Sequence, residues 1–228
     1  MKTYPPSELT PALQQAVDQI SGRFTNILAD ARVEAFDAGE KIVGAHNKIT
    51  SLRFLVQGKA KICLVHENGR ASILDFIGSG DYIGELSFLE IETQPKDVIA
   101  ISACICLCFP FSLTQDILTK DAAFLFSLNQ YLGKKMLKRS WFHAKSQNYE
   151  LKDRLAAYIL RSETGGVYKE KHTETAEFLG VSYRHLLYTL QQFQQEGLLV
   201  KNAKGYKIHS AGLKLLAKDI DDALDMPI

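Results

Sequence analysis

The sequence predicts an α+β fold in which a β-rich half precedes a helical half. Short strand-like runs cut by glycines extend from about Val33 to Phe111, and a 3.6-residue apolar period returns at Leu113 and persists. Near the carboxyl end, two short helical segments precede a basic hairpin, a pattern typical of a winged helix-turn-helix. With 228 residues, the chain is long enough for one or two domains that need no disulfide or metal to fold.

The composition excludes a disordered or fibrous chain, because 46% of the residues are apolar and 23% are charged, as in ordinary soluble proteins. The apolar run from Val98 to Phe111 is too short to span a bilayer. Met1 to Pro6 contain no apolar signal region, so we expect a cytoplasmic protein with no membrane partner. The net charge of +1 does not by itself indicate nucleic acid, although a regional asymmetry could.

The first element expected is an amphipathic helix between Ser7 and Ala31, which Gly22 could interrupt. Its apolar residues recur at steps of three and four: Leu9, Leu13, Val17, Ile20, Phe24 and Leu28.

The β-rich region begins with runs at Leu52–Val56 and Ala60–Val65 on either side of Gly58. Asn68-Gly69 then lies between two β-rich runs, which is the strongest short hairpin signal because both turn residues need a positive φ. Further turns are expected at Gly78, Gly80 and Gly84. Strands this short and regularly spaced predict a sandwich or a small barrel.

A long helix is predicted from about Ala122 to Gln147. Such a helix needs a partner surface, which is either the β domain or a second copy of itself. We expect dimerisation along the stripe formed by Leu125, Leu128, Leu132 and Met136. The solvated side is expected to carry Lys134, Lys135, Lys138 and Arg139.

A further helix is predicted at Leu151–Ser162, ended by Gly165-Gly166. The segment 173–193 then has the layout of a helix-turn-helix, in which Ala176 permits a close helix crossing and Gly180 supplies the turn. Ser182 is a suitable N-cap for the second helix. The residues expected to be buried there are Leu186, Leu190 and Phe193. A hairpin at Leu198–Val200 and Tyr206–Ile208 and a terminal helix at Ala211–Leu224 complete the chain.

The second helix of this motif would enter the DNA major groove with its first residues toward the bases. Arg184 can pair with guanine O6 and N7, and Ser182 and Tyr183 are placed for phosphate. Leu187 and Tyr188 would be exposed on the same side. The hairpin would place Lys204, with Lys201 and Lys207, beside the DNA backbone. The alternative is an ordinary helical hairpin with a solvated arginine; the basic hairpin favours double-stranded DNA as the partner.

Two weaker patterns have mainly structural interpretations. In Gly80–Leu86, backbone amides near Gly84 could face an anion and Glu85 could accept from a hydroxyl, but a tight turn is favoured on this pattern alone. Cys104, Cys106 and Cys108 share one face of a strand, where small core residues are favoured over a redox site or cluster. The six histidines show no metal-binding spacing, so no metal site or catalytic residue is predicted and the cofactor is left unknown.

The order and spacing of four segments over residues 33–209 resemble the Crp/Fnr superfamily of bacterial transcription regulators. The segments are Phe54–Lys61, Asn68-Gly69, Gly80–Leu86 and the helix-turn-helix at 173–193. Glu170–Thr173 and Leu179–Tyr188 look most like the YeiL-type subgroup.

The resemblance implies a cyclic-nucleotide-binding-like β-roll (a double-stranded jelly roll) with the N-terminal helix at 1–120, a dimerisation helix at 121–148 and a winged helix at 149–228. It also implies a homodimer that binds palindromic promoter sites to regulate transcription, with RNA polymerase as a further partner. A small effector in the β-roll would contact Gly84, Glu85, Leu86 and Lys96.

Three departures from the family pattern change these expectations. Cyclic-nucleotide binders carry an Arg-Ser or Arg-Thr pair where this chain has Pro95-Lys96-Asp97. Lys96 offers the cyclic phosphate only a point charge, and Asp97 would repel it. Tight cyclic AMP binding is therefore not expected. No cysteine precedes Cys63, so the cysteine cluster of oxygen-sensing members cannot form. Tyr183, Arg184 and Tyr188 replace the usual recognition residues, which predicts a different DNA site.

The residues therefore favour a transcription regulator without a catalytic role. One alternative is a cupin-like β-barrel enzyme, which the scattered histidines disfavour. Another is a nucleotide sensor that acts through a protein partner; DNA binding by the C-terminal half would separate it from the regulator.

Overall fold

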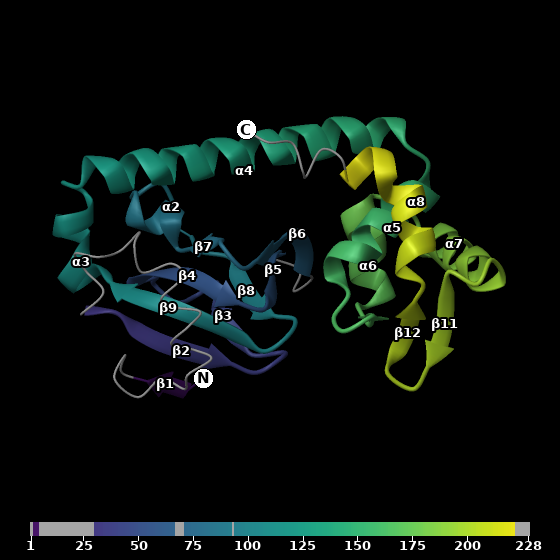
Figure 1. Cartoon of the computed structure of the whole chain (residues 1–228), viewed down its shortest axis with the longest axis horizontal. Helices are drawn as coiled ribbons and strands as arrows, with labels where there is room; N and C mark the ends of the chain where they lie inside the picture. Colours follow the sequence, from purple (N-terminus) through teal and green to yellow (C-terminus); the bar gives the residue numbers. More distant parts are fainter. Residues whose placement is uncertain (1, 5–29, 67–70, 93, 222–228) are drawn as a thin grey trace. The chain divides into compact units, whose positions relative to one another are not determined.

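The computed structural model describes residues 2–4, 30–66, 71–92 and 94–221 (Figure 1). It divides into two compact units, Met1–Ser127 and Leu128–Ile228. Strands dominate the first unit and helices the second, which confirms the predicted α+β order. The helix predicted at Ser7–Ala31 lies outside the described residues except at Asp30 and Ala31. Among the described helices, none is long and apolar enough to cross a membrane.

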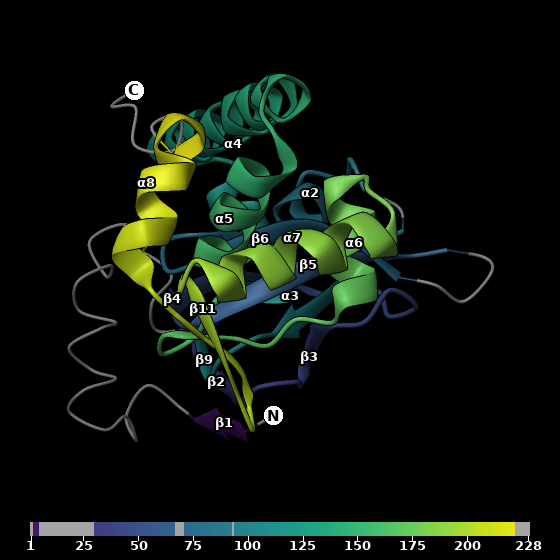
Figure 2. The ribbon, with the colours of Figure 1, turned by 90° about the vertical axis from the view of Figure 1, so that its right-hand side faces the viewer.

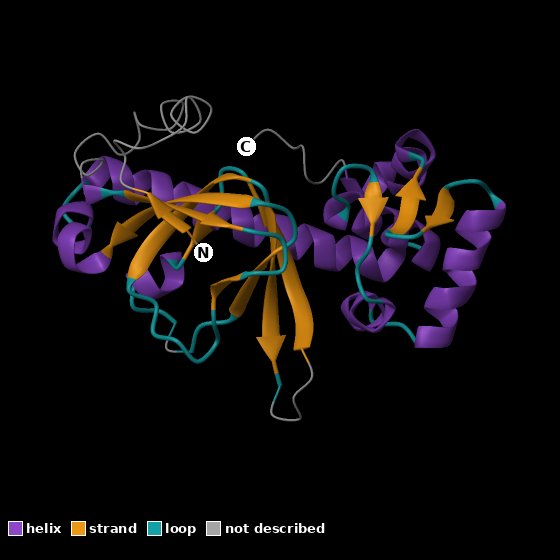
Figure 3. Ribbon diagram, turned by 90° about the horizontal axis from the view of Figure 1, so that it is seen from below, coloured by secondary structure: helices purple, strands orange, loops and turns teal. Residues whose placement is uncertain are grey.

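The first unit is a roll of two antiparallel sheets, as the sandwich prediction required (Figure 3). One sheet has the order β1-β2-β9-β4-β7 and the other β3-β8-β5-β6. Their bounds are β1 Lys2–Tyr4, β2 Arg32–Phe36, β3 Lys41–Val43, β4 Ser51–Gln57, β5 Lys59–Val65, β6 Ala71–Gly78, β7 Tyr82–Ile83, β8 Asp97–Ala100 and β9 Cys104–Pro110.

The turns predicted at Gly58 and at Asn68-Gly69 each join two successive strands. Gly58 joins β4 to β5 at φ 103°, and a Cβ there would lie 2.4 Å from the Ala103 carbonyl oxygen, so only glycine fits. Beyond it, β5 and β6 pair with Val65 opposite Ala71, which confirms the hairpin that Asn68-Gly69 predicts. The turn itself lies outside the described residues.

The core of the first unit lies on both faces of the five-stranded sheet. Between the sheets, Phe36, Leu55, Ile77 and Val98 pack with Cys104 and Cys106. On the other face, the Phe88 ring contacts those of Phe111 and Phe124, with centroids 5.8 and 5.9 Å away. These rings come from the short helices α2 (Glu85–Phe88) and α3 (Phe111–Leu118) and from the start of α4 (Ala122–Asn148), which matches the predicted long helix.

The second unit contains the helices and the hairpin predicted for it, except that the predicted end of the terminal helix at 222–224 lies outside the described residues (Figure 2). Its elements are α5 Leu151–Ser162, β10 Val167–Tyr168, α6 His172–Leu179, α7 Tyr183–Gln195, β11 Leu199–Asn202, β12 Gly205–Ile208 and α8 Ser210–Asp221. Strand β10 was not predicted: it pairs with β12 and extends the hairpin to three strands in the order β10-β12-β11.

Candidate nucleic-acid interface

Helices α6 and α7 form the predicted helix-turn-helix around Gly180. Gly180 ends α6 in the left-handed conformation at φ 65°, ψ 36°, and the Val181 amide donates to the Ala176 carbonyl oxygen at 3.0 Å. Ser182 Oγ accepts from the His185 amide at 3.2 Å, which confirms the predicted N-cap of α7. Local turn chemistry therefore fixes where α7 starts.

The two sides of α7 differ sharply in exposure. Leu186, Leu190 and Phe193 are at most 1% exposed, as predicted, and Thr189 joins them. The remaining surface of the first two turns is open to solvent: Tyr183 is 49% exposed, Leu187 38% and Tyr188 61%, and Ser182 and Arg184 are exposed as well. The structure thus places the predicted DNA-contacting residues of α7 on its solvent side.

The same solvent side continues to Gln191 and Gln195, which sequence reasoning missed. Both are exposed, and they follow Arg184 and Tyr188 at helical spacing. That spacing was the available signal. A prediction based on the first residues of a recognition helix does not reach these two glutamines.

The hairpin after α7 is a wing with an ordered tip. The Lys204 amide donates to Asn202 Oδ1 at 2.8 Å. Gly205 has φ 138°, and a Cβ there would lie 2.3 Å from the Tyr168 carbonyl oxygen, so β10 can approach only because residue 205 is glycine. Lys201, Lys204 and Lys207 are all exposed and present three positive charges along this wing.

A buried polar network attaches α6 to β10, the strand that pairs with β12 of the wing. The hydroxyls of Tyr168 and Thr175, from β10 and α6, lie 2.7 Å apart, and Thr175 Oγ1 donates to the Lys171 carbonyl oxygen at 3.0 Å. Tyr158 of α5 reaches the same Thr175 Oγ1 at 3.4 Å. Burial raises the pKa of both phenols, so both remain neutral hydrogen-bonding groups.

A second attachment point is Arg154 of α5, which lies close to the turn of the motif. Its Nη1 donates to the carbonyl oxygen of Leu179, the last residue of α6, at 2.9 Å. Helix C-termini leave their last carbonyls without intrahelical partners and carry partial negative charge, so a cation there is favourable. No local sequence pattern indicates this contact between residues 25 positions apart.

The effector-type segment Gly80–Leu86 contains strand β7 and the first residues of helix α2, and Gly84 is the turn residue that joins them. Gly84 has φ 87°, and a Cβ there would lie 2.9 Å from both Ile49 and the Ser51 carbonyl oxygen, so the fold itself requires glycine. Glu85 is 6% exposed and Leu86 half-buried. The Leu86 carbonyl accepts from the Glu92 amide at 3.2 Å, and Glu92 Oε1 pairs with the Lys96 ammonium. Lys96 is therefore linked to this segment, but its charge is already engaged by a carboxylate.

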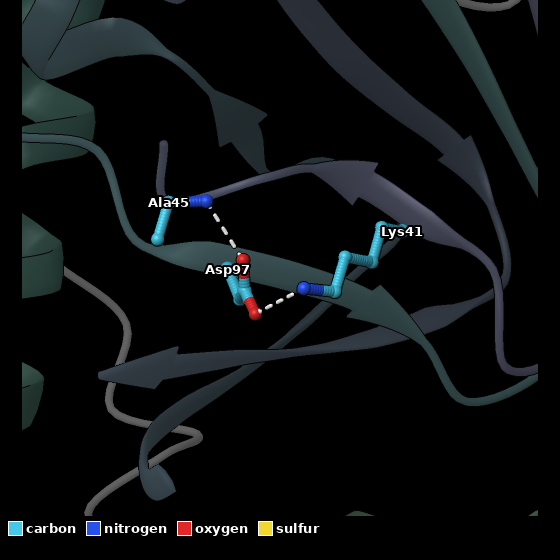
Figure 4. Close-up of polar contacts among 3 residues, drawn as sticks. All are labelled: Lys41, Ala45 and Asp97. Atoms are coloured by element: carbon cyan, nitrogen blue, oxygen red, sulfur yellow. Dashed lines mark hydrogen bonds and ion pairs between the residues drawn. The ribbon is translucent and has the colours of Figure 1, made fainter. Parts of the chain in front are cut away.

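Asp97 is engaged elsewhere, which corrects the expectation that it acts as an unpaired repulsive charge. Its Oδ1 accepts from the Ala45 amide at 2.7 Å and its Oδ2 lies 2.7 Å from Lys41 Nζ (Figure 4). Burial would raise the pKa of Asp97, but these two partners outweigh it and lower the pKa. The carboxylate secures the loop after β3 and is offset by Lys41.

The thiols of β9 lie in the core, which confirms the favoured interpretation of Cys104, Cys106 and Cys108. All three are free and at most 2% exposed. Burial raises the pKa of Cys104 and Cys108 to about 11 and that of Cys106 further. Little thiolate exists at neutral pH, so these sulfurs are poor nucleophiles. Across the described ranges, no group of His, Cys, Asp and Glu could hold a metal ion.

A β-roll followed by a winged helix-turn-helix defines a regulator-type architecture, and comparisons with known proteins agree. Residues 33–121 match the cyclic nucleotide-binding domain family. The chain is 40% identical over 184 residues to the regulatory protein YeiL of Escherichia coli O157:H7, covering 81% of this chain and 84% of that protein.

Solved structures share the fold. A putative Crp/Fnr-family regulator from Eubacterium rectale matches with a TM-score of 0.68 and 17% identity over 93% of this chain and 96% of that chain. A Crp/Fnr-family regulator from Thermus thermophilus matches with a TM-score of 0.64 and 21% identity over 82% and 98%. The chain belongs to the Crp/Fnr superfamily of transcription regulators, and YeiL is the relative that shows it.

Proposed function

We propose that this protein is a sequence-specific DNA-binding transcription regulator that binds a palindromic promoter site as a homodimer and has no catalytic step. The observation that carries the proposal is the solvent side of α7, where Arg184 stands among exposed side chains opposite the buried Leu186 and Leu190. The exposed lysines of the wing lie in the same unit. A cationic helix face beside a cationic hairpin suits the major groove and the adjoining phosphates.

The proposed roles follow from chemistry. Arg184 reads guanine through O6 and N7, because its planar fork matches that pair of acceptors. Ser182, Tyr183 and Lys204 contact phosphates and fix the register of the protein without reading sequence. Leu187 and Tyr188 face the bases beside Arg184. We also propose that the protein acts in the cytoplasm and regulates transcription through contact with RNA polymerase.

The homodimer is proposed to form through the helix at 121–148, between a β-roll at 1–120 and a winged helix at 149–228. Leu128 of the expected stripe is only 1% exposed, because it is already buried within the chain, and Leu125 and Leu132 are half-buried. The open apolar surface comprises Phe126, Met136, Leu137 and Trp141, which are 66%, 65%, 43% and 48% exposed. Phe126 and Leu137 lie on the side opposite Phe124 and Leu128, with Trp141 beside them, so a second copy would cover that side.

The β-roll is proposed to hold a small effector other than cyclic AMP near Gly84, Glu85, Leu86 and Lys96. A cyclic phosphate needs a guanidinium fork and further donors to offset its desolvation. The Lys96 ammonium lacks that fork and is paired with Glu92.

Selection of bound duplexes from a random-sequence library by the full-length protein tests the proposal. We expect one enriched motif with two inverted half-sites centred about one helical turn, roughly 34 Å, apart. If no sequence is enriched at any salt concentration, the proposed regulator is refuted, and the nucleotide sensor that acts through a protein partner is favoured.

A further inference from the structure

The solvent side of α7 includes three exposed side chains with large apolar surfaces. Tyr183, Leu187 and Tyr188 are 49%, 38% and 61% exposed within the first two turns. The Leu187 side chain has no polar atom, so it can contribute only apolar contact. Exposed apolar clusters usually mark an interaction surface.

The charge around this cluster indicates what covers it. Helix α7 contains Arg184 and His185 but no aspartate or glutamate. The wing adds exposed Lys201, Lys204 and Lys207. The cluster is flanked by cations, and its own helix carries no acidic residue. Such a surface complements a polyanion that also offers apolar groups. Duplex DNA meets that description, because each thymine displays a 5-methyl group in the major groove.

Resting on the proposed function, we propose that Leu187 and Tyr188 read thymine methyl groups, so that each half-site combines one guanine with neighbouring A·T pairs. From Arg184 to Tyr188 the helix rises about 6 Å at roughly 1.5 Å per residue. Base pairs stack at about 3.4 Å. The thymines therefore lie within about two base-pair steps of the guanine that Arg184 contacts.

Replacing thymine by deoxyuridine tests this directly, because it removes the methyl group and leaves base pairing unchanged. The probe is the duplex selected from the random library, carrying single deoxyuridine substitutions through one half-site. At the contacted positions we expect an affinity loss of about fourfold per methyl, which corresponds to about 0.8 kcal/mol. Other thymines should tolerate the substitution.

Leu187→Ala is the paired variant. It should bind the thymine duplex more weakly and lose the effect of deoxyuridine at one position. Leu215→Ala is the matched control, since Leu215 is 77% exposed on α8 and should leave deoxyuridine sensitivity unchanged. Circular dichroism of each variant checks that the fold is retained.

The outcomes separate this inference from the proposed function. Selective binding that ignores every deoxyuridine substitution would overturn methyl reading and leave the regulator intact. Equal deoxyuridine sensitivity in Leu187→Ala and wild type would overturn the assignment to Leu187. Absence of any selected motif would overturn both proposals.

Discussion

The guanidinium of Arg154 donates from Nη1 to the carbonyl oxygen of Leu179 at 2.9 Å, joining α5 to the last residue of the first helix of the helix-turn-helix. Arg154 Nε is buried and has no hydrogen-bond partner among the described residues. One charge-assisted bond therefore holds this group at the end of α6, immediately before Gly180. The position of α7 depends on that turn, so Arg154 connects α5 to the placement of the proposed reading helix.

Arg154→Ala should lower the free energy of unfolding by about 1.5–3 kcal/mol, the range for a hydrogen bond to a charged group. The variant should also weaken DNA binding by the same factor for every sequence, since Arg154 is not proposed to contact a base. Chemical denaturation and titration of the selected duplex measure the two effects. Lys152→Ala, an exposed cation on the same helix, is the control. Unchanged stability in Arg154→Ala would show that the capping contact contributes nothing.

Phe126→Glu combined with Leu137→Glu should convert the dimer into a monomer at micromolar concentration. The two carboxylates would be buried without partners in the proposed helix–helix interface. Sedimentation equilibrium measures the mass, and Leu215→Glu tests whether any exposed apolar residue has the same effect. A wild-type protein that stays monomeric even on DNA would contradict the proposed dimer.

Cyclic AMP should not bind with a dissociation constant in the low micromolar range or below. Lys96 is the nearest substitute for the family's arginine, and its pairing with Glu92 would have to be broken before it could contact phosphate. Because Lys41 offsets Asp97, the expected weakness rests on the missing guanidinium fork and not on repulsion. Calorimetric titration of the full-length protein decides this, and low-micromolar affinity would refute the account of the β-roll.

The thiols of β9 should react slowly in the folded protein at pH 8, because the pKa of Cys104 and Cys108 is raised to about 11. These pKa values exceed that of an unfolded cysteine, about 8.5. The contribution of these thiols to the free energy of unfolding is therefore fully present below about pH 8.5 and is lost as the pH rises toward 11. Ellman's reagent monitors the reaction, with denatured protein as the fast reference. Complete reaction within seconds in the native state would revive a redox role for these cysteines.

Local signals predicted most of the proposed DNA-binding region, and contacts distant in sequence account for what was missed. Gly180 and Ser182 were predictable because a left-handed turn and an N-cap each depend on one residue's own chemistry. The Arg154–Leu179 and Asp97–Ala45 contacts join residues 25 and 52 positions apart, and no local pattern encodes them. Strand β10 was too short, at two residues, to show alternation.

Leu128 illustrates a different reason for failure. An apolar residue at helical spacing is consistent with burial against its own chain or against a second copy, and periodicity cannot distinguish the two. Only the exposure of each residue in the folded chain separates buried Leu128 from open Phe126 and Met136.

Base discrimination by Arg184→Ala tests the central claim most directly. Affinities of wild type and variant are measured for the selected duplex and for all single-base changes in one half-site, with Lys204→Ala as the phosphate-contact control. We predict that Arg184→Ala loses about 1–3 kcal/mol and no longer discriminates at one guanine position, whereas Lys204→Ala weakens all sequences alike and lowers the salt dependence. An Arg184→Ala protein with the wild-type base preference at every position would contradict the assignment of α7 as the reading helix.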